Sequence, residues 1–281
     1  MVRFLATMTA STPHSHYALG NADAEHERLI WQAARVAPTT ERLFREAGIG
    51  PGQRVLDIGS GVGDVALLAA RLVGPSGEVV GIERDAKSIA RARARVAETG
   101  LLNVSFTQTD VSQIPDNKPF DAAVGRFILM FLPDPVAVVR SFSRLIRPGG
   151  VVAFQEPSWA PALALLAPLP LWSAAASLVH ETFLRSGANP ELGTALYQVF
   201  EGAGLPRATM RSEMYLGKNS DIAQWYSDIV CTLRPQMQQF NLPLESVGSL
   251  DTLMERLQAA VEASKSVVSL PAFVGAWSRK A

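Results

Sequence analysis

Three acidic residues each follow a short apolar segment, and glycines follow the first of them. Asp57 stands just before the loop GSGVGD, Glu83 ends the segment EVVGIE, and Asp110 follows NVSFTQT. If the apolar segments are strands of an open α/β sheet, these acids meet at the edge where such sheets bind ligands. A carboxylate there needs hydrogen-bond donors or an opposite charge. One such acid could equally cap a helix, but the series predicts a ligand with amino and hydroxyl groups.

The glycine loop from Gly59 to Gly63 allows backbone angles and a close ligand approach that side chains would prevent. An ordinary strand-to-helix turn can look the same, so its context decides. A nicotinamide-dependent oxidoreductase, NAD(P)-dependent, is the alternative enzyme class, since it also has a glycine loop and an acid after the second strand. Two residues count against it: Asp64 stands where that fingerprint has Gly or Ala, and Asp57 has no counterpart there.

The chain between Gln53 and Glu156 alternates short apolar runs with segments of helical spacing. This alternation predicts parallel strands joined by helices. Residues 21–47 predict two helices, separated near Pro38, that cover the sheet. Further helices are expected to about residue 186, at 190–203 and at 221–263, with strands at TMRSEMYLG and AFVGAWSR.

Several segments, taken in order, resemble the motifs of class I S-adenosylmethionine (SAM) dependent methyltransferases, closest to the ubiquinone/menaquinone-type small-molecule branch. They are VLDIGSGVGD, VVGIERD, the TD pair at 109–110, FDAAVGR and LIRPGGVV. The resemblance implies an α/β fold, a Rossmann-like seven-stranded methyltransferase sheet with helical cap insertions. Its last strand, for which AFVGAWSR is the candidate, runs antiparallel. We predict an N-terminal helical cap at 1–50, a SAM-binding core at 51–160, and substrate-cap helices with the final strands of the same domain at 161–281.

The resemblance also implies how SAM is held. The amino-acid end of SAM lies on the glycine loop, its ribose on the acid after the second strand, and its adenine after the third strand. The residues concerned are Asp57, Gly59 and Gly61 for the amino-acid end, Glu83 for the ribose, and Asp110 with Val111 for the adenine. Arg84, next to Glu83, is also expected to bind the cofactor.

Arg126 departs from the small or amide residue that many relatives have after the fourth strand. We expect its guanidinium to pair with the SAM carboxylate in a bidentate manner, with a packing or surface role as the alternative. Tyr17 and Gln32 are expected to fold over SAM as part of a lid. Simple polarity of a helix surface explains these two residues equally well.

The acceptor side has weaker signals. Glu156, His180 and Tyr226 are candidate catalytic residues, although a cap, a satisfied helix histidine and a core aromatic are the alternatives. Trp159, Trp172 and Tyr226 are expected to line a closed substrate pocket, or else to pack in the core. A catalytic base is needed only if the acceptor must lose a proton to react.

Bulk properties exclude several classes. Among 281 residues, 26 Lys and Arg balance 26 Asp and Glu, so no nucleic-acid partner is expected. One cysteine and four scattered histidines give no disulfide and no metal site. Pro161, Pro168 and Pro170 interrupt the most apolar stretch, so we expect no membrane insertion. The N-terminus lacks the apolar core of a signal peptide, which predicts a cytoplasmic protein.

These expectations combine into one function. The protein transfers a methyl group from SAM to a small-molecule acceptor, aromatic or hydrophobic, in natural-product or quinone-type metabolism. A SAM-binding regulator without catalysis is the other alternative. Nothing in the sequence points to a particular oligomeric state.

Overall fold

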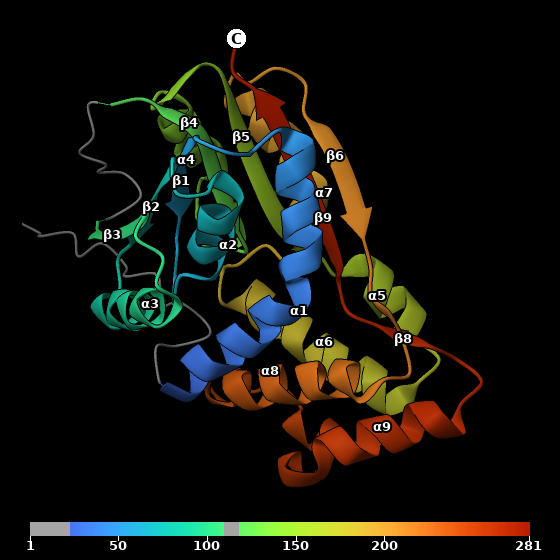
Figure 1. The fold of residues 1–281 in the computed structure, drawn as a ribbon. Helices are drawn as coiled ribbons and strands as arrows, with labels where there is room; N and C mark the ends of the chain where they lie inside the picture. Colours follow the sequence, from blue (N-terminus) through green and yellow to red (C-terminus); the bar gives the residue numbers. More distant parts are fainter. Residues whose placement is uncertain (1–22, 110–117) are drawn as a thin grey trace, which may run out of the picture.

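The computed structural model describes residues 23–109 and 118–281 and has a seven-stranded sheet at its centre. The strands follow the order β3-β2-β1-β4-β5-β9-β6 across the sheet (Figure 1). Strands β3, β2, β1, β4 and β5 are parallel, and β9 runs antiparallel between β5 and β6. The predicted sheet and its antiparallel last strand AFVGAWSR are therefore confirmed. The bounds are Arg54–Ile58 for β1, Glu78–Glu83 for β2, Val104–Gln108 for β3, Phe120–Arg126 for β4, Ile146–Ser158 for β5, Thr209–Glu213 for β6 and Ala272–Arg279 for β9.

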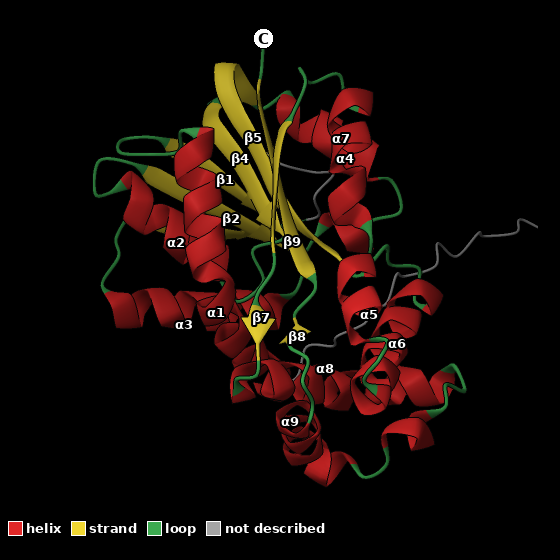
Figure 2. Ribbon diagram, turned by 90° about the vertical axis from the view of Figure 1, so that its right-hand side faces the viewer, coloured by secondary structure: helices red, strands yellow, loops and turns green. Residues whose placement is uncertain are grey.

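Helices cover both faces of this sheet, with α1 and α2 on one side and α4 and α7 on the other (Figure 2). A parallel strand must be followed by a crossover, and helices supply it here. The carboxyl ends of the parallel strands consequently lie at one edge. The covering helices are α1 (Asp23–Ala47), α2 (Asp64–Val73), α3 (Ala86–Thr99), α4 (Pro135–Ser143) and α7 (Leu192–Gly202).

Helix α1 is continuous, so the expectation of two separate helices over residues 21–47 is wrong. Pro38 lies inside α1 and lacks the N–H that would bond to the preceding turn, which bends a helix without necessarily ending it. Figure 1 shows this bend. The half after the bend packs on the sheet. There Leu43 lies against Gly275, so closely that a Cβ added to Gly275 would be 2.7 Å from the Leu43 side chain. The half before the bend runs along the carboxyl edge.

A helical cap, formed by α5, α6, α8 and α9, lies beyond that edge (Figure 1). Aromatic side chains fill its interior: the ring centroids of Trp172 and Tyr226 are 5.4 Å apart, and those of Trp225 and Tyr226 are 5.1 Å apart. No helix within the described residues is long and apolar enough to cross a membrane. The cap and linking elements are α5 (Ala160–Leu166), α6 (Pro170–Arg185), α8 (Ser220–Gln239) and α9 (Leu253–Ala263), the short helices η1 (Leu129–Phe131), η2 (Leu244–Val247) and η3 (Leu250–Thr252), and the strand pair β7 (Leu216–Gly217) and β8 (Val268–Ser269).

Candidate active site

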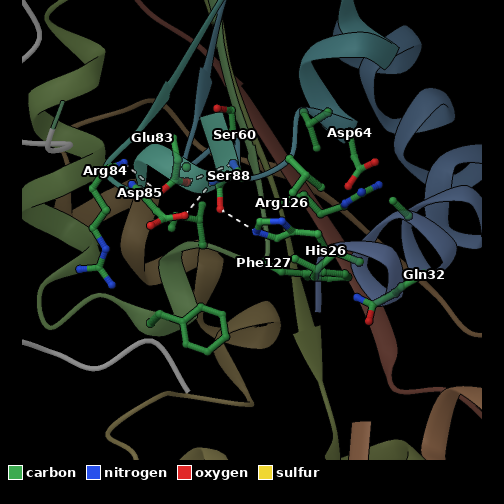
Figure 3. A pocket seen from close by; sticks show the side chains of 18 of the residues that line it. His26, Gln32, Ser60, Asp64, Glu83, Arg84, Asp85, Ser88, Arg126 and Phe127 are labelled. Atoms are coloured by element: carbon green, nitrogen blue, oxygen red, sulfur yellow. Dashed lines mark hydrogen bonds between the residues drawn. The ribbon is translucent and has the colours of Figure 1, made fainter. Parts of the chain in front are cut away.

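A cavity of about 180 Å³ lies at the carboxyl ends of β1, β2 and β4 (Figure 3). One face of α1, the glycine loop, the β2–α3 turn and the segment after β4 line it. The polar and charged side chains on the lining include His26, Gln32, Ser60, Asp64, Glu83, Arg84, Asp85, Ser88 and Arg126. The apolar ones include Leu29, Ala33, Val36, Phe127, Ile128, Phe131 and Leu132.

The glycine loop presents bare backbone to this cavity. Gly59 and Gly61 have φ angles of 66° and 50°, in the left-handed region that favours glycine. A Cβ at Gly59 would lie 2.6 Å from the side chain of Ile128, so a larger residue cannot fit there. A Cβ at Gly61 would meet nothing within 4 Å, which leaves open space in front of the loop for a ligand.

Glu83 ends β2, and backbone amides fix its carboxylate. Its Oε2 accepts from the N–H of Gly61 at 3.0 Å, and its Oε1 accepts from the N–H groups of Arg84 and Asp85 at 2.8 and 3.0 Å. These bonds join the glycine loop to the β2–α3 turn. The carboxylate therefore has a defined direction at the cavity before any ligand binds.

Asp57 lies below the glycine loop and does not line the cavity itself. It is 1% exposed, and its Oδ2 has no hydrogen-bond partner among the described residues. Burial raises the pKa of this carboxyl to about 7, although the charge of Arg126 and the N–H of Ala66 oppose the shift. Any effect of Asp57 on a ligand is therefore electrostatic and acts through the loop.

Arg126 ends β4 and does line the cavity, where Figure 3 shows it near Asp64. Its Nη1 donates to the hydroxyl of Thr40 at 3.0 Å, and that hydroxyl donates to Oε1 of Gln155 at 2.7 Å. Burial lowers the pKa of the guanidinium, and the nearby charges of Asp64 and Asp57 raise it. The network connects α1 to β4 and β5 and fixes where the cation lies.

The candidate catalytic residues do not meet at this cavity. Glu156 is fully buried on β5 and accepts from backbone amides. His180 lies on α6, where its Nε2 is 3.5 Å from Glu191. Tyr226 is fully buried and donates to the carbonyl of Ser269 at 3.1 Å. None of the three is on the lining.

The aromatic residues predicted to line a substrate pocket lie in the interior of the cap. Trp159 and Trp172 are 1% and 0% exposed, and the indole N–H of Trp172 donates to the carbonyl of Leu257 at 3.0 Å. Among the described residues that line the cavity, none belongs to the cap helices. The expectation that the cap, with Trp159, Trp172 and Tyr226, forms the chamber wall is therefore corrected: α1 and the segment after β4 form it.

The structure brings some of the residues expected to bind the cofactor together at the cavity. Gly59, Gly61, Glu83, Arg84 and Arg126 line the cavity. Gln32 of α1 joins them, and its side-chain oxygen also accepts from Arg28 at 2.6 Å. Tyr17, Asp110 and Val111 lie outside the described residues.

His26 and Ser88 are site residues that the sequence analysis missed. His26 Nε2 lies 3.3 Å from the hydroxyl of Ser88, which joins α1 to α3 across the cavity (Figure 3). The helical spacing of His26, Leu29 and Gln32 could have placed His26 on the same face as the predicted lid residue. The segment from Phe127 to Leu132 was missed too, although its place directly after β4 was a signal.

The comparison with known families decides which family the chain belongs to. Residues 49–204, more than half of the chain, match the family described as a methyltransferase domain. The chain belongs to the methyltransferase domain family. This membership confirms the predicted class, the SAM-dependent methyltransferases, and SAM as the cofactor of the family fold.

Curated relatives match the core of this methyltransferase-family chain. The ubiquinone/menaquinone biosynthesis C-methyltransferase UbiE of Pseudomonas paraeruginosa is 39% identical over 118 residues, which cover 40% of this chain and 46% of that protein. The arsenite methyltransferase of Halobacterium salinarum is 33% identical over 111 residues, which cover 39% of this chain and 28% of that protein. The match thus spans less than half the length of either relative.

Solved structures resemble the fold over a longer stretch. A putative methyltransferase from Bacillus halodurans has a TM-score of 0.56 at 18% identity, covering 86% of this chain and 98% of that one. A SAM-dependent methyltransferase from Aquifex aeolicus has a TM-score of 0.51 at 21% identity, covering 68% and 92%. The [4+2]-cyclase SpnF has a TM-score of 0.54 at 19% identity, covering 87% and 80%.

The residues around the cavity are chemically suited to SAM, independently of the family match. The space in front of Gly61 admits a ligand against bare backbone. Glu83 offers carboxylate oxygens at the cavity, and the buried Oδ2 of Asp57 below the loop favours a positive charge above it. These features match a ligand with hydroxyl groups at one end and an ammonium at the other.

Proposed function

We propose that the protein transfers the methyl group of SAM to a small organic acceptor with an aromatic or hydrophobic body. The observation that supports this most is a single cavity with both kinds of lining. Its glycine loop and Glu83 suit the cofactor, while Phe127, Ile128 and Phe131 offer an apolar surface to the acceptor. Such a surface selects acceptors of low polarity because it cannot replace lost hydrogen bonds to water.

The cofactor contacts follow from the positions of the lining residues. Gly59 and Gly61 offer their backbone to the amino-acid end, and Asp57 attracts its ammonium from below the loop. Glu83 accepts from the ribose hydroxyls, and Arg126 pairs with the carboxylate. The adenine contacts of Asp110 and Val111, a cofactor contact of Arg84 and the lid contacts of Tyr17 and Gln32 belong to the same proposal.

When bound, SAM supplies an activated methyl group, so the chain need not generate the electrophile. The task left to the protein is to exclude water and to align the acceptor atom with the methyl carbon. Helix α1 does the first, since His26, Leu29 and Val36 line the cavity from above the strand ends. The apolar residues after β4 do the second. His26 is an imidazole on the lining that can take a proton if the acceptor must lose one.

The alternatives differ in what they predict. The family match gives no support to an NAD(P)-dependent oxidoreductase. A regulator would bind SAM and leave it intact. Because the fold also occurs in a [4+2]-cyclase, the test must detect the methylated product itself.

Incubation of the purified protein with SAM and a panel of phenols, indoles and amines tests the proposal. We expect S-adenosylhomocysteine and a methylated acceptor in equal amounts, measured by mass spectrometry, and loss of both with Gly61→Val, which fills the space in front of the loop. SAM binding without turnover of any acceptor would indicate the regulator, and binding of NADH without SAM would contradict the proposal altogether.

A further inference from the structure

The carboxyl of Glu156, on β5, bonds to the backbone of the segment that follows β4. Its Oε1 accepts from the N–H groups of Ile128 and Leu129 at 3.0 and 2.8 Å, and its Oε2 accepts from the N–H of Met130 at 3.3 Å. These three consecutive amides start η1. The side chain of Glu156 is fully buried, so no water competes for these bonds.

The segment that Glu156 holds forms the apolar lining after β4. Phe127, Ile128 and Phe131 line the cavity, and Ile128 also packs against Gly59 of the glycine loop. Phe127 has a φ of 55°, a left-handed conformation that is costly for a bulky residue. The surrounding bonds must compensate for this strain, and those of Glu156 begin at the very next residue.

The surroundings of Glu156 do not suit a catalytic base. It lies off the cavity lining, and among the described residues only backbone amides, of Ile128, Leu129 and Met130, hydrogen-bond its carboxyl. Burial raises its pKa to about 8, and among the described residues only the backbone hydrogen bonds oppose that shift. The carboxyl is therefore mostly neutral at neutral pH, a state that an amide resembles in shape and charge.

We propose that Glu156 is a positioning residue for methyl transfer: through the amides of Ile128, Leu129 and Met130 it fixes the wall that aligns the acceptor. This inference rests on the proposed function, because the wall has an acceptor to align only if the protein is a methyltransferase. Glu156 touches neither the acceptor nor SAM. Its effect must therefore appear in acceptor binding and alignment, and only weakly in the affinity for the cofactor.

Three variants separate this role from the alternatives. Glu156→Ala removes all the bonds to the segment, whereas Glu156→Gln keeps the carbonyl that faces Ile128 and Leu129. Glu191→Ala is the matched control, since Glu191 also accepts from two consecutive amides, those of Trp159 and Ala160, but at the start of α5 and away from the cavity. Glu156→Asp, whose carboxyl is one methylene shorter, replaces the alanine variant if that does not fold.

The first readout is amide hydrogen exchange at residues 128–130, which needs no acceptor. We expect exchange to be faster by about tenfold or more in Glu156→Ala. It should be nearly unchanged at Ile128 and Leu129 in Glu156→Gln, which keeps their acceptor, and nearly unchanged throughout the segment in Glu191→Ala. The second is kinetics with whichever acceptor the panel identifies. There we expect Glu156→Ala to raise the acceptor KM about tenfold, with the S-adenosylhomocysteine Kd within about threefold of the original and Glu156→Gln close to it.

Two results would overturn the inference. Unchanged exchange at 128–130 in Glu156→Ala, or in Glu156→Asp if it takes its place, would show that the side chain does not hold the wall. A loss of kcat in Glu156→Gln as large as in Glu156→Ala would show that the carboxyl acts on the reacting atoms. Failure of the proposed function can be told apart from these results. In that case the unchanged protein would methylate no acceptor, while the exchange measurements would still show whether Glu156 holds the segment 128–130.

Discussion

Glu83 illustrates how backbone groups prepare a single side chain for its ligand. The amides of Gly61, Arg84 and Asp85 direct its carboxylate before SAM arrives, so little ordering remains to be done on binding. We expect Glu83→Ala to weaken S-adenosylhomocysteine binding by about 1.5–3 kcal/mol, the range for hydrogen bonds to a charged group. Titration calorimetry measures this change.

Glu78 offers the matched control, because it begins the same strand that Glu83 ends and pairs at the surface with Arg54 at 2.7 Å. Glu78→Ala should leave the Kd unchanged. Equal weakening by both variants would mean that the loss comes from β2 as a whole, and no weakening by Glu83→Ala would mean that the ribose lies elsewhere.

Asp57 supports a second prediction at this scale. Burial raises its pKa to about 7, so at neutral pH part of the protein carries the protonated form. A positive charge brought onto the glycine loop stabilises the ionised form and lowers that pKa. We therefore expect SAM binding near pH 7 to release protons, detected by calorimetry in buffers of different ionisation enthalpy.

Asp57→Asn should abolish this proton release. Asp121→Asn is the comparison, because Asp121 lies at the start of β4, at the edge of the sheet opposite the cavity. Hydrogen bonds from the Arg54 N–H and from Arg147 lower its pKa. If Asp57→Asn releases as many protons as the unchanged protein, the charge of Asp57 does not respond to the ligand.

Helix α1 is joined to the sheet by buried polar contacts. The hydroxyl of Thr40 is fully buried and connects Arg126 to Gln155. Thr40→Val keeps the shape of the side chain but leaves a donor and an acceptor without their partner. We expect it to lower the free energy of unfolding by about 1–3 kcal/mol and to weaken S-adenosylhomocysteine binding, because Arg126 loses its anchor. Urea titration and calorimetry measure the two effects.

Thr182→Val is the control for this substitution. Thr182 is equally buried, but among the described residues its hydroxyl bonds just to the carbonyl of Leu178, in its own helix α6. It should lower stability less and leave ligand binding unchanged. A Thr40→Val variant that binds S-adenosylhomocysteine normally would show that the α1 network does not position Arg126.

The strands and helices that were predicted correctly are those whose own stretch of sequence carries the signal. Strands β1, β2 and β4 are buried on both faces, and their continuous apolar runs between helical segments are typical of parallel strands. Helix α1 was predicted in two pieces because Pro38 is a strong local signal, but packing of Leu43 on the sheet stabilises the continuous helix. Local propensity could not include that distant contact.

Side-chain roles were harder to predict than elements. Glycines and acids at strand ends owe their position to the backbone, so Gly59, Gly61 and Glu83 reached the cavity as expected. Trp172 and Tyr226 are aromatic, as residues of a substrate pocket often are. The packing of α6 on α8 places them in the core instead. The contacts of Glu156 likewise depend on how η1 folds back onto β5.

At the scale of the whole molecule, the cap supports the site from outside. The predicted boundaries at 50/51 and 160/161 stay a prediction, and in the structure they fall between α1 and β1 and at the start of α5. The cap reaches α1 through Arg35, whose Nη2 donates to Asp221 of α8 at 3.0 Å. The cap thus contacts α1 at the surface, while α1 and the segment after β4 line the cavity.

The buried acids also determine how the stability of the whole molecule varies with pH. Glu156 has its pKa raised from 4.5 to about 8, and Asp57 from 3.8 to about 7, both mainly through burial. Each group binds its proton more tightly in the folded state than in the unfolded chain. The stability that this provides is complete below the unfolded pKa and is lost as the pH rises through the folded pKa.

We therefore expect the free energy of unfolding to fall between about pH 5 and pH 8, by at most about 1.4 kcal/mol per pH unit for each group. Urea titrations across this range measure the slope. Glu156→Gln cannot ionise and should flatten the curve toward pH 8, whatever its effect on stability at pH 5. A Glu156→Gln protein whose stability falls with pH as steeply as that of the unchanged chain would show that Glu156 is not the group that titrates, and that its carboxyl is already ionised at the amides of η1.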